Sequence, residues 1–274
     1  MNGRLLALRR ALAGAEPPLS APTAAAGSQA GVDGGAGGAH RAWRLRWLPV
    51  CASTETELER WLRRQPPAER LEQPRAVLAR RQCFGHGQHG RPWQSPAGGV
   101  WLSAALPWPA DPQEAAAPGL AVAVALAEAL GRHGVPARLK WPNDLLLITS
   151  GGPRKLAGLL PGLRLRGSRV RWARIGLGIN GRNPVPAGAV NLRDAAGLRH
   201  GEPLALAALV LLALERAMAE ADDGEAVRRR AEALLIPPEP QWLEGEWWQP
   251  SGLALDGGLR LRRADGGERI LRRF

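Results

Sequence analysis

The two lysines of this chain are the residues whose chemistry can be singled out most readily from the sequence. The chain has 37 basic residues, and all of them except Lys140 and Lys155 are arginines. A lysine ammonium is a compact point charge and an arginine guanidinium is a planar fork, so a site that needs the first geometry resists replacement by the second. Against this arginine-rich background, the two lysines predict a site that handles negative charge.

Each lysine stands in a segment with a recognisable pattern. Residues 139–146 read Leu-Lys-Trp-Pro-Asn-Asp-Leu-Leu, so that Lys140 and Asp144 flank an extended-to-turn X-Pro unit. An ordinary turn with a solvated lysine is the alternative for this segment. In residues 154–160, Lys155 enters an apolar strand. Lys140, Asp144 and Lys155 are therefore the candidate catalytic residues.

A glycine-rich loop at residues 85–90 is the next candidate. Its G-x-G-x-x-G spacing matches a dinucleotide-binding fingerprint, but that fingerprint needs a helix to begin at its end, and here the sequence predicts a strand instead. The Gly-Lys-Ser/Thr of a Walker loop is also missing. Backbone N–H groups of glycines can approach an anion closely. The loop is therefore predicted to fold over an anionic ligand and bind it, and a flexible hairpin is the alternative.

Two further features point to the same region. Residues 175–180 read Ile-Gly-Leu-Gly-Ile-Asn and predict a strand with alternate positions free of side chains, where a flat ligand fits against the backbone. Four of the five asparagines lie in one stretch of the chain, namely Asn143, Asn180, Asn183 and Asn191. The rare polar residues therefore gather around the second lysine.

The apolar pattern predicts the elements that must position these segments. A helix runs through Leu58, Trp61 and Leu62, and Thr54 with Glu57 three residues later predicts a capping box at its start. The other expected helices are 119–130, 203–219 and 225–235, and the expected strands are 77–81, 100–106, 138–141, 145–148, 156–165 and 170–179. This pattern predicts an α/β fold with a β-rich centre.

The composition divides the chain into three regions. Residues 1–40 are rich in Ala, Gly and Pro and predict disorder, although residues 4–10 would also suit a short basic helix like that of a transit peptide. Residues 41–236 carry the candidate chemistry. After the proline-rich linker at 237–240, two short strands, 253–262 and 268–272, predict a small β module over residues 241–274.

Composition also narrows the class of protein. Two cysteines, Cys51 and Cys83, do not make a disulfide framework and favour a reducing, cytoplasmic location, and no apolar run reaches the ~18 residues of a membrane span. The net charge of +12 and pI near 11.4 suggest a nucleic-acid-binding protein as a distant alternative. The arginines are spread along the chain, however, and no H-E-x-x-H motif supports a metal hydrolase.

Taken in order, the glycine loop, the Lys-Trp-Pro-Asn-Asp-Leu segment, the Lys-Leu-Ala-Gly segment and the Gly-Leu-Gly-Ile-Asn strand resemble biotin protein ligases. The resemblance covers residues 43–192. It implies a catalytic core related to class II aminoacyl-tRNA synthetases, with a mixed or antiparallel sheet and a small SH3-like C-terminal module. The absence of a winged-helix pattern before Trp43 implies the monofunctional type, without specific DNA binding.

The resemblance also implies roles for particular residues. Lys155 would hold the biotin carboxylate and the α-phosphate, and Asp144 would orient the acceptor lysine. The other residues implied to bind biotin are Ser53, Thr54, Gln82, Gly85, Gly87, Gly158, Gly176 and Gly178. Those implied to bind ATP are His86, Gln88, Arg91, Trp93, Asn143 and Asn180. The family often has arginines within the glycine loop, and this chain has His86, Gln88 and His89 there instead.

The implied reaction is ATP-dependent biotinylation of a lysine on a biotin carboxyl carrier protein of acetyl-CoA carboxylase, through biotinyl-5'-AMP, with Mg²⁺ as activator. Metal ligands are not identified, and a monomer and a homodimer are both compatible with the resemblance. The nearest alternative is a lipoate or octanoyl ligase or transferase, which shares the core but takes a linear acyl chain. The Lys-Trp-Pro-Asn-Asp segment and Gln82 favour biotin.

Overall fold

A mixed seven-stranded sheet forms the centre of the computed structural model, which describes residues 3–13, 43–113 and 115–273. The strand order is β1-β2-β3-β7-β6-β5-β4. β1 (Arg44–Leu48) and β2 (Arg75–Ala79) are parallel; the remaining neighbours, β3 (Val100–Leu106), β7 (Arg169–Ile179), β6 (Gly152–Arg166), β5 (Asp144–Thr149) and β4 (Ala137–Lys140), pair antiparallel. The predicted α/β class with a mixed sheet is confirmed.

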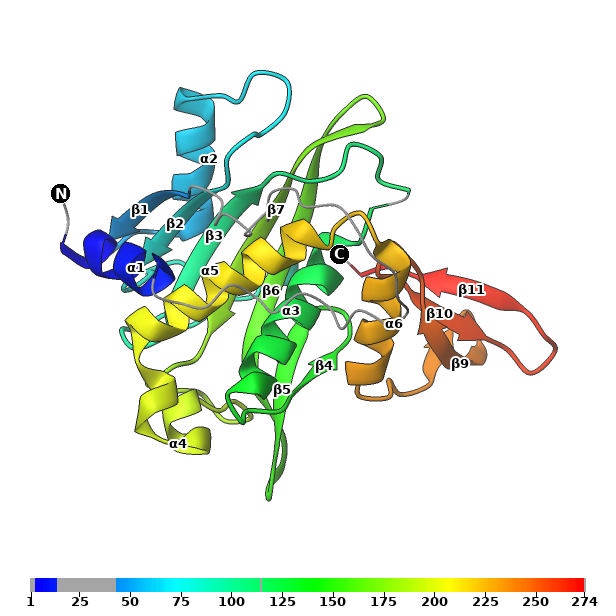
Figure 1. Cartoon of the computed structure of the whole chain (residues 1–274). Helices are drawn as coiled ribbons and strands as arrows, with labels where there is room; N and C mark the ends of the chain where they lie inside the picture. Colours follow the sequence, from blue (N-terminus) through cyan, green and yellow to red (C-terminus); the bar gives the residue numbers. More distant parts are fainter. Residues whose placement is uncertain (1–2, 14–42, 114, 274) are drawn as a thin grey trace, which may run out of the picture.

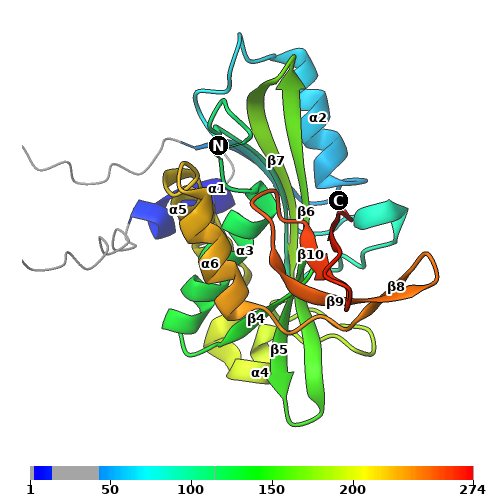
Figure 2. The ribbon, with the colours of Figure 1, turned by 90° about the vertical axis from the view of Figure 1, so that its right-hand side faces the viewer.

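Helices lie on both faces of this sheet (Figures 1 and 2). α3 (Pro118–Arg132), α5 (Pro203–Ala219) and α6 (Gly224–Leu234) lie on one face, and α2 (Thr54–Arg64) lies on the other. Side chains alternate along a strand, so Leu78 joins the core under α3 and α5, while Val77 packs with Leu58 and Trp61 of α2. The sheet is therefore buried on both faces near α2, where the candidate residues begin.

The capping box expected at Thr54 is wrong in its details. Ser53 is the N-cap residue of α2, with extended backbone and a side chain that accepts a hydrogen bond from the Glu55 N–H (3.2 Å). Thr54 is the first helical residue, and its hydroxyl instead contacts Gln82 and Ser103. The Thr54 side chain, which a capping box would use within the helix, therefore joins the start of α2 to the sheet.

A helix, α1 (Gly3–Ala13), stands within the stretch for which composition predicts disorder. Leu8 is fully buried and Leu12 is nearly so, and both belong to the main core. The apolar contacts that fix α1 come from the tertiary fold, so the local composition does not reveal them. The rest of residues 1–40 lies outside the described residues.

The C-terminal module is a separate four-stranded antiparallel sheet with the order β11-β10-β9-β8. Its strands are β8 (Gln241–Leu243), β9 (Glu246–Leu253), β10 (Leu259–Arg262) and β11 (Glu268–Leu271). The sequence predicts only two strands here, because β8 is three residues long and Pro250 and Gly252 interrupt the pattern of β9. Leu253, Leu259 and Leu261 extend into the main core, so the module packs firmly on the larger domain.

Three short helical elements complete the chain: η1 (Gln88–Gly90), α4 (Leu192–Ala196) and η2 (Leu198–Gly201). In the part of the chain that the structure describes, no helix combines the length and apolar character that a membrane span needs.

Candidate active site

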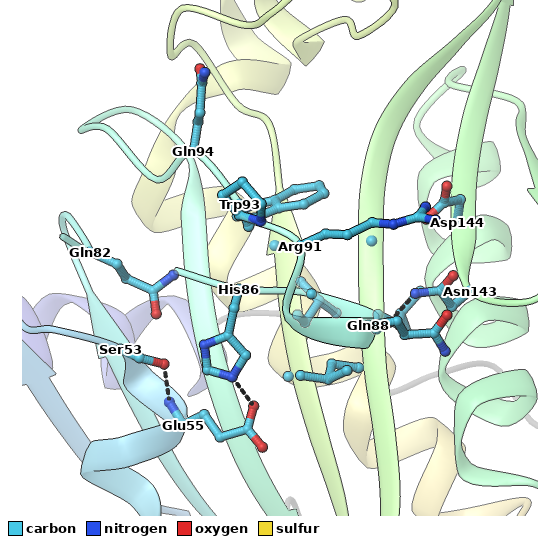
Figure 3. Close-up of a pocket in the computed structure, with 18 of the residues that line it drawn as sticks. Ser53, Glu55, Gln82, His86, Gln88, Arg91, Trp93, Gln94, Asn143 and Asp144 are labelled. Atoms are coloured by element: carbon cyan, nitrogen blue, oxygen red, sulfur yellow. Dashed lines mark hydrogen bonds and ion pairs between the residues drawn. The ribbon is translucent and has the colours of Figure 1, made fainter. Parts of the chain in front are cut away.

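A pocket of about 420 Å³ lies where the N-terminus of α2 and the glycine loop meet β3, β6 and β7 (Figure 3). Most of the residues singled out in the sequence line it, although they come from segments far apart in the chain. The predicted residues that line the pocket are Ser53, Thr54, Gln82, His86, Gly87, Gln88, Arg91, Trp93, Asn143, Asp144, Lys155, Gly158, Gly176, Gly178 and Asn180.

Two predicted residues do not line the pocket. Lys140 is exposed on β4, opposite Asp144 in the β4–β5 register. Gly85 lies at the base of the glycine loop, where a Cβ atom would come within 2.6 Å of the Ser95 hydroxyl and of the Trp93 carbonyl oxygen. Gly85 thus permits close packing of the loop base, and Lys140 is left as a charged neighbour of the pocket.

One end of the pocket is charged. The Lys155 Nζ atom lies 2.7 Å from Asp144 Oδ1 and 5.0 Å from the centroid of the Trp93 ring. Both charged side chains are partly shielded, with 35% of Lys155 and 19% of Asp144 exposed. The only lysine in the pocket is therefore held by a carboxylate and an aromatic face.

The turn before β5 is fixed by its neighbours on both sides. The Asn143 side chain donates to the Leu159 carbonyl oxygen (2.6 Å), and the Leu159 N–H donates to the Asn143 carbonyl oxygen (2.8 Å). On the other side, Trp141 Nε1 donates to the Gly257 carbonyl oxygen (2.9 Å) of the C-terminal module. These bonds set the position from which Asp144 reaches Lys155.

The indole ring of Trp93 occupies the place where the sequence predicts a flat ligand against glycine backbone. Gly158 and Gly178 face each other across the β6–β7 ladder. A Cβ on Gly178 would lie 2.5 Å from Trp93 Nε1, and one on Gly158 would lie 3.0 Å from Trp93 Cζ3. These two glycines therefore seat the tryptophan, and the tryptophan in turn forms a wall of the pocket.

The opposite end of the pocket is built from neutral polar groups. Gln82 Oε1 accepts from the Thr54 N–H (2.7 Å) and from the Thr54 hydroxyl (2.9 Å), while Gln82 Nε2 donates to the Ser95 hydroxyl (2.8 Å). The Thr54 and Ser103 hydroxyls are 2.8 Å apart. Ser53, Thr54 and Ser103 are all buried. This end can exchange hydrogen bonds with a neutral polar group.

Glu55 is a carboxylate at the same end, and it is not among the residues that stand out in the sequence. Its side chain is only 12% exposed, Oε1 lies 2.8 Å from Arg174 Nη1, and Oε2 lies 3.6 Å from His86 Nε2. An acidic residue in the first turn of a helix has an ordinary explanation in the helix dipole, so its type and position gave no signal. Ser103 was missed as well, although a serine within the apolar strand β3 is a usable signal.

A group of buried asparagines supports the rear of the pocket. Asn183 Nδ2 donates to Asn180 Oδ1 (3.0 Å), and Asn191 Nδ2 donates to the Asn183 carbonyl oxygen (3.0 Å). Asn191 is also the N-cap of α4, where it accepts from the Asp194 N–H (2.8 Å). Three of the four clustered asparagines thus form one network, of which Asn180 lines the pocket. The fourth, Asn143, also lines the pocket but bonds to Leu159 instead.

Comparison with known proteins relates part of the chain to one family. Residues 47–180 match the model of the Biotin/lipoate A/B protein ligase family. The chain is 39% identical over 117 residues to a biotin–[acetyl-CoA-carboxylase] ligase of Paracoccus denitrificans, covering 42% of this chain and 47% of that protein. It is also 39% identical over 109 residues to the bifunctional ligase/repressor BirA of Salmonella typhimurium, covering 38% of this chain and 32% of that protein. The matches thus span about half, or less, of the length of these curated relatives.

Solved structures show the same fold. A biotin protein ligase from Aquifex aeolicus in complex with biotin and ATP has a TM-score of 0.62 and 23% identity, covering 83% of this chain and 95% of that chain. The biotin acetyl coenzyme A carboxylase synthetase of Helicobacter pylori has a TM-score of 0.57 and 21% identity, covering 84% of this chain and 100% of that chain. At these identities the comparison establishes the fold alone.

Proposed function

We propose, on the premise that residues 47–180 of this chain belong to the Biotin/lipoate A/B protein ligase family, that the protein is a biotin protein ligase. It would use ATP to attach biotin to a lysine of a biotin carboxyl carrier domain of acetyl-CoA carboxylase, through biotinyl-5'-AMP. The domains that serve this activity are the predicted catalytic region 41–236 and the module 241–274. Location in the cytoplasm stays a prediction from cysteine usage.

The observation that carries this proposal is the chemical difference between the two ends of the pocket. One end offers buried neutral hydrogen-bonding groups on Thr54, Gln82 and Ser103, and the other offers the ammonium of Lys155. Biotin has a neutral polar ureido ring at one end and a carboxylate at the other. A linear acyl chain has no polar head group, so it would leave the buried polar groups without partners, which is costly. The pocket therefore favours biotin over octanoate or lipoate.

The first step joins two anions, the biotin carboxylate and the α-phosphate of ATP. A carboxylate oxygen attacks the α-phosphorus, the bond to the β-phosphate oxygen breaks, and pyrophosphate leaves. Lys155 would contact both anions and stabilise the charge that builds at phosphorus, a role for which a cation fixed in a shielded site is most effective. The Asp144 carboxylate holds that ammonium in place before the substrates bind.

In the second step, the amine of the acceptor lysine attacks the acyl carbon of the mixed anhydride, and AMP leaves. A lysine amine is protonated near neutral pH and has to lose a proton before it attacks. Asp144 would be released from Lys155 when that lysine turns to the substrate anions. It would then orient the incoming ammonium and accept a proton from it on Oδ1.

The glycine loop would close over the adenylate and exclude water, since a mixed anhydride hydrolyses readily. His86 and Gln88 of this loop line the pocket, as do Arg91 and Trp93 just after it. The polar positions within the loop hold histidines and a glutamine, so the arginine that adjoins the loop is Arg91. Arg91 and Lys155 would therefore provide most of the positive charge that the protein directs at the phosphates.

Mg²⁺ is expected to arrive with ATP, and the polar oxygens of the pocket suit it. Mg²⁺ usually takes one or two carboxylates together with substrate phosphates and water. Asp144 would supply the carboxylate during the first step, before it meets the acceptor lysine, and Asn180 a neutral oxygen. Among the described residues no cluster of three or more metal-binding side chains offers a dedicated cage. When bound, Mg²⁺ neutralises phosphate charge.

The direct test is transfer to a protein acceptor. The purified protein, an isolated biotin carboxyl carrier domain, ATP, Mg²⁺ and biotin are incubated, and the carrier is analysed by intact mass and peptide mapping. We expect one biotinyl group on one lysine, and none when ATP is omitted. An unmodified carrier under conditions where a known biotin ligase modifies it fully would refute the proposed function.

A further inference from the structure

The neutral end of the pocket has a limited set of hydrogen-bonding groups left for a ligand. Gln82 Oε1 already accepts two hydrogen bonds from Thr54, and one N–H of its amide donates to Ser95. The Thr54 hydroxyl donates to Gln82, so its contact with Ser103 uses the Ser103 proton. The Ser53 oxygen accepts from the Glu55 N–H. Two donors therefore remain, the Ser53 hydroxyl proton and the second Gln82 N–H.

Acceptors are scarcer than donors at this end. The Ser103 oxygen keeps lone pairs, and the remaining strong acceptor among the pocket residues here is Glu55 Oε2. The other oxygen of that carboxylate is engaged by Arg174 at 2.8 Å, whereas the His86 Nε2 atom lies 3.6 Å from Oε2. Oε2 also faces Gly176, since a Cβ there would lie 3.8 Å from it. Figure 3 shows the Glu55 side chain beside Ser53, Gln82 and His86, across the pocket from Asp144.

To bind the ureido ring, the pocket has to supply two hydrogen-bond donors and two acceptors. Its carbonyl oxygen takes hydrogen bonds, and each of its two nitrogens gives one. The free Ser53 and Gln82 protons match the carbonyl, and the Ser103 oxygen matches one N–H. We propose that Glu55 Oε2 accepts the other ureido N–H and is therefore a residue that determines selectivity for biotin. This inference rests on the proposed function and extends it by a residue that no sequence motif indicated.

The charge of Glu55 fits this role. A shielded carboxylate is costly unless it is paired, and Arg174 on β7 provides the pairing while leaving Oε2 directed at the pocket. An acyl chain without N–H groups would displace solvent from Oε2 and give it no partner, so it would be rejected. His86 lies over the same oxygen, which places the start of the glycine loop against the end of the pocket that holds the ring.

The test compares Glu55→Gln with the matched control Glu59→Gln. Both residues lie on α2 and both pair with Arg174, but Glu59 Oε1 is 3.0 Å from Arg174 and its side chain is 48% exposed outside the pocket. The assay is biotin-dependent exchange of labelled pyrophosphate into ATP. The substrates are biotin and two analogues, each methylated at one ureido nitrogen. The measured quantity is the ratio of kcat/KM for biotin to that for each analogue.

A hydrogen bond to a charged group corresponds to about a 10- to 100-fold change in equilibrium. Glu55→Gln is therefore expected to raise the KM for biotin about 10- to 100-fold, to leave the KM for ATP within about twofold, and to reduce the discrimination against one analogue by at least about tenfold. Glu59→Gln should leave all three values unchanged. A structural role for Glu55 would instead lower kcat/KM for biotin and both analogues equally.

The outcomes distinguish a failure of the proposed function from a failure of the role of Glu55. If wild-type protein shows no exchange with biotin, the proposed function fails. If wild-type protein exchanges and Glu55→Gln keeps the wild-type ratios, the function stands and the role of Glu55 is overturned. If Glu55→Gln does not fold, Glu55→Asp replaces it, because this variant keeps the charge and draws the carboxylate back from the pocket. For the inference to hold, Glu55→Asp must discriminate less than wild type against one of the methylated analogues.

Discussion

Gly178 lies under the indole ring of Trp93, so alanine at this position should displace the ring. A methyl carbon on Gly178 would be 2.5 Å from Trp93 Nε1 and 2.6 Å from Cε2. Favourable contacts between such atoms begin near 3.5 Å, so the ring has to move by about 1 Å. Overfilling a packed site in this way typically costs about 1–3 kcal/mol of folding free energy.

The catalytic effect should exceed the effect on stability. Trp93 also lies 5.0 Å from the Lys155 ammonium, measured to the ring centroid, so a shift of the ring removes a contact that positions this cation. A displacement of about 1 Å at a reacting group commonly costs about 100-fold in rate. Gly178→Ala is therefore expected to lower kcat/KM for biotin-dependent pyrophosphate exchange about 100-fold, with the circular dichroism spectrum of the wild type.

Two comparisons make this prediction specific. Gly162→Ala places a methyl group on β6 at an ordinary 3.5 Å from the Arg174 side chain, and it should leave activity within about twofold. In a Trp93→Ala background, Gly178→Ala should destabilise the fold by less than about 0.5 kcal/mol, because the clashing ring is gone. Full activity of Gly178→Ala, or an unchanged cost in the Trp93→Ala background, would refute the argument from packing.

Three further outcomes are expected. Lys155→Ala should slow adenylation at least ~100-fold, and Lys155→Arg should also fail substantially, because a planar fork does not replace the point charge; wild-type turnover of either folded variant would contradict this assignment. Burial raises the pKa of Glu128, but hydrogen bonding from Arg230 and the charges of Arg216, Arg230 and Arg132 outweigh it and hold this pKa below its ordinary value of 4.5. Glu128 should thus stabilise the fold above about pH 4.5 and lose that contribution as the pH falls further, so urea unfolding should show Glu128→Gln less stable than wild type at pH 7 and a smaller difference in acid. Burial raises the pKa of Cys51 from 9.0 to about 11, so at pH 8 iodoacetamide should modify exposed Cys83 first and Cys51 about 100-fold more slowly than an ordinary thiol, as peptide mapping would show.

The sequence predicts helices and strands well where the local apolar pattern agrees with the burial that the tertiary fold imposes. β3 matches the predicted strand 100–106, and α5 matches the predicted helix 203–219, because each is a mainly apolar run buried in the core. For α1 the sequence left disorder and a short basic helix over residues 4–10 both open, since Leu8 and Leu12 acquire their partners only from the folded sheet and α5. β9 was missed because Pro250 and the adjacent Trp247 and Trp248 give it no regular alternation of apolar and polar residues.

The same distinction holds for the site. Lys155 and Asp144 stand out by residue type and spacing, and the structure brings them within 2.7 Å. Glu55 does not stand out, because its significance depends on Arg174 and on the pocket, and neither contact is visible along the chain. Local sequence therefore reveals groups that are chemically unusual, and the fold is needed to reveal ordinary groups in unusual places.

The central claim is that this pocket activates biotin with ATP, and the most direct measurement is exchange of labelled pyrophosphate into ATP with biotin, lipoate and octanoate in parallel. We expect exchange with biotin alone, since only biotin can satisfy both the neutral and the cationic end of the pocket. Exchange with octanoate or lipoate and not with biotin would contradict the account and assign the protein to the linear-acyl branch of the family. A lack of exchange with all three acids, in folded protein, would contradict adenylate formation itself.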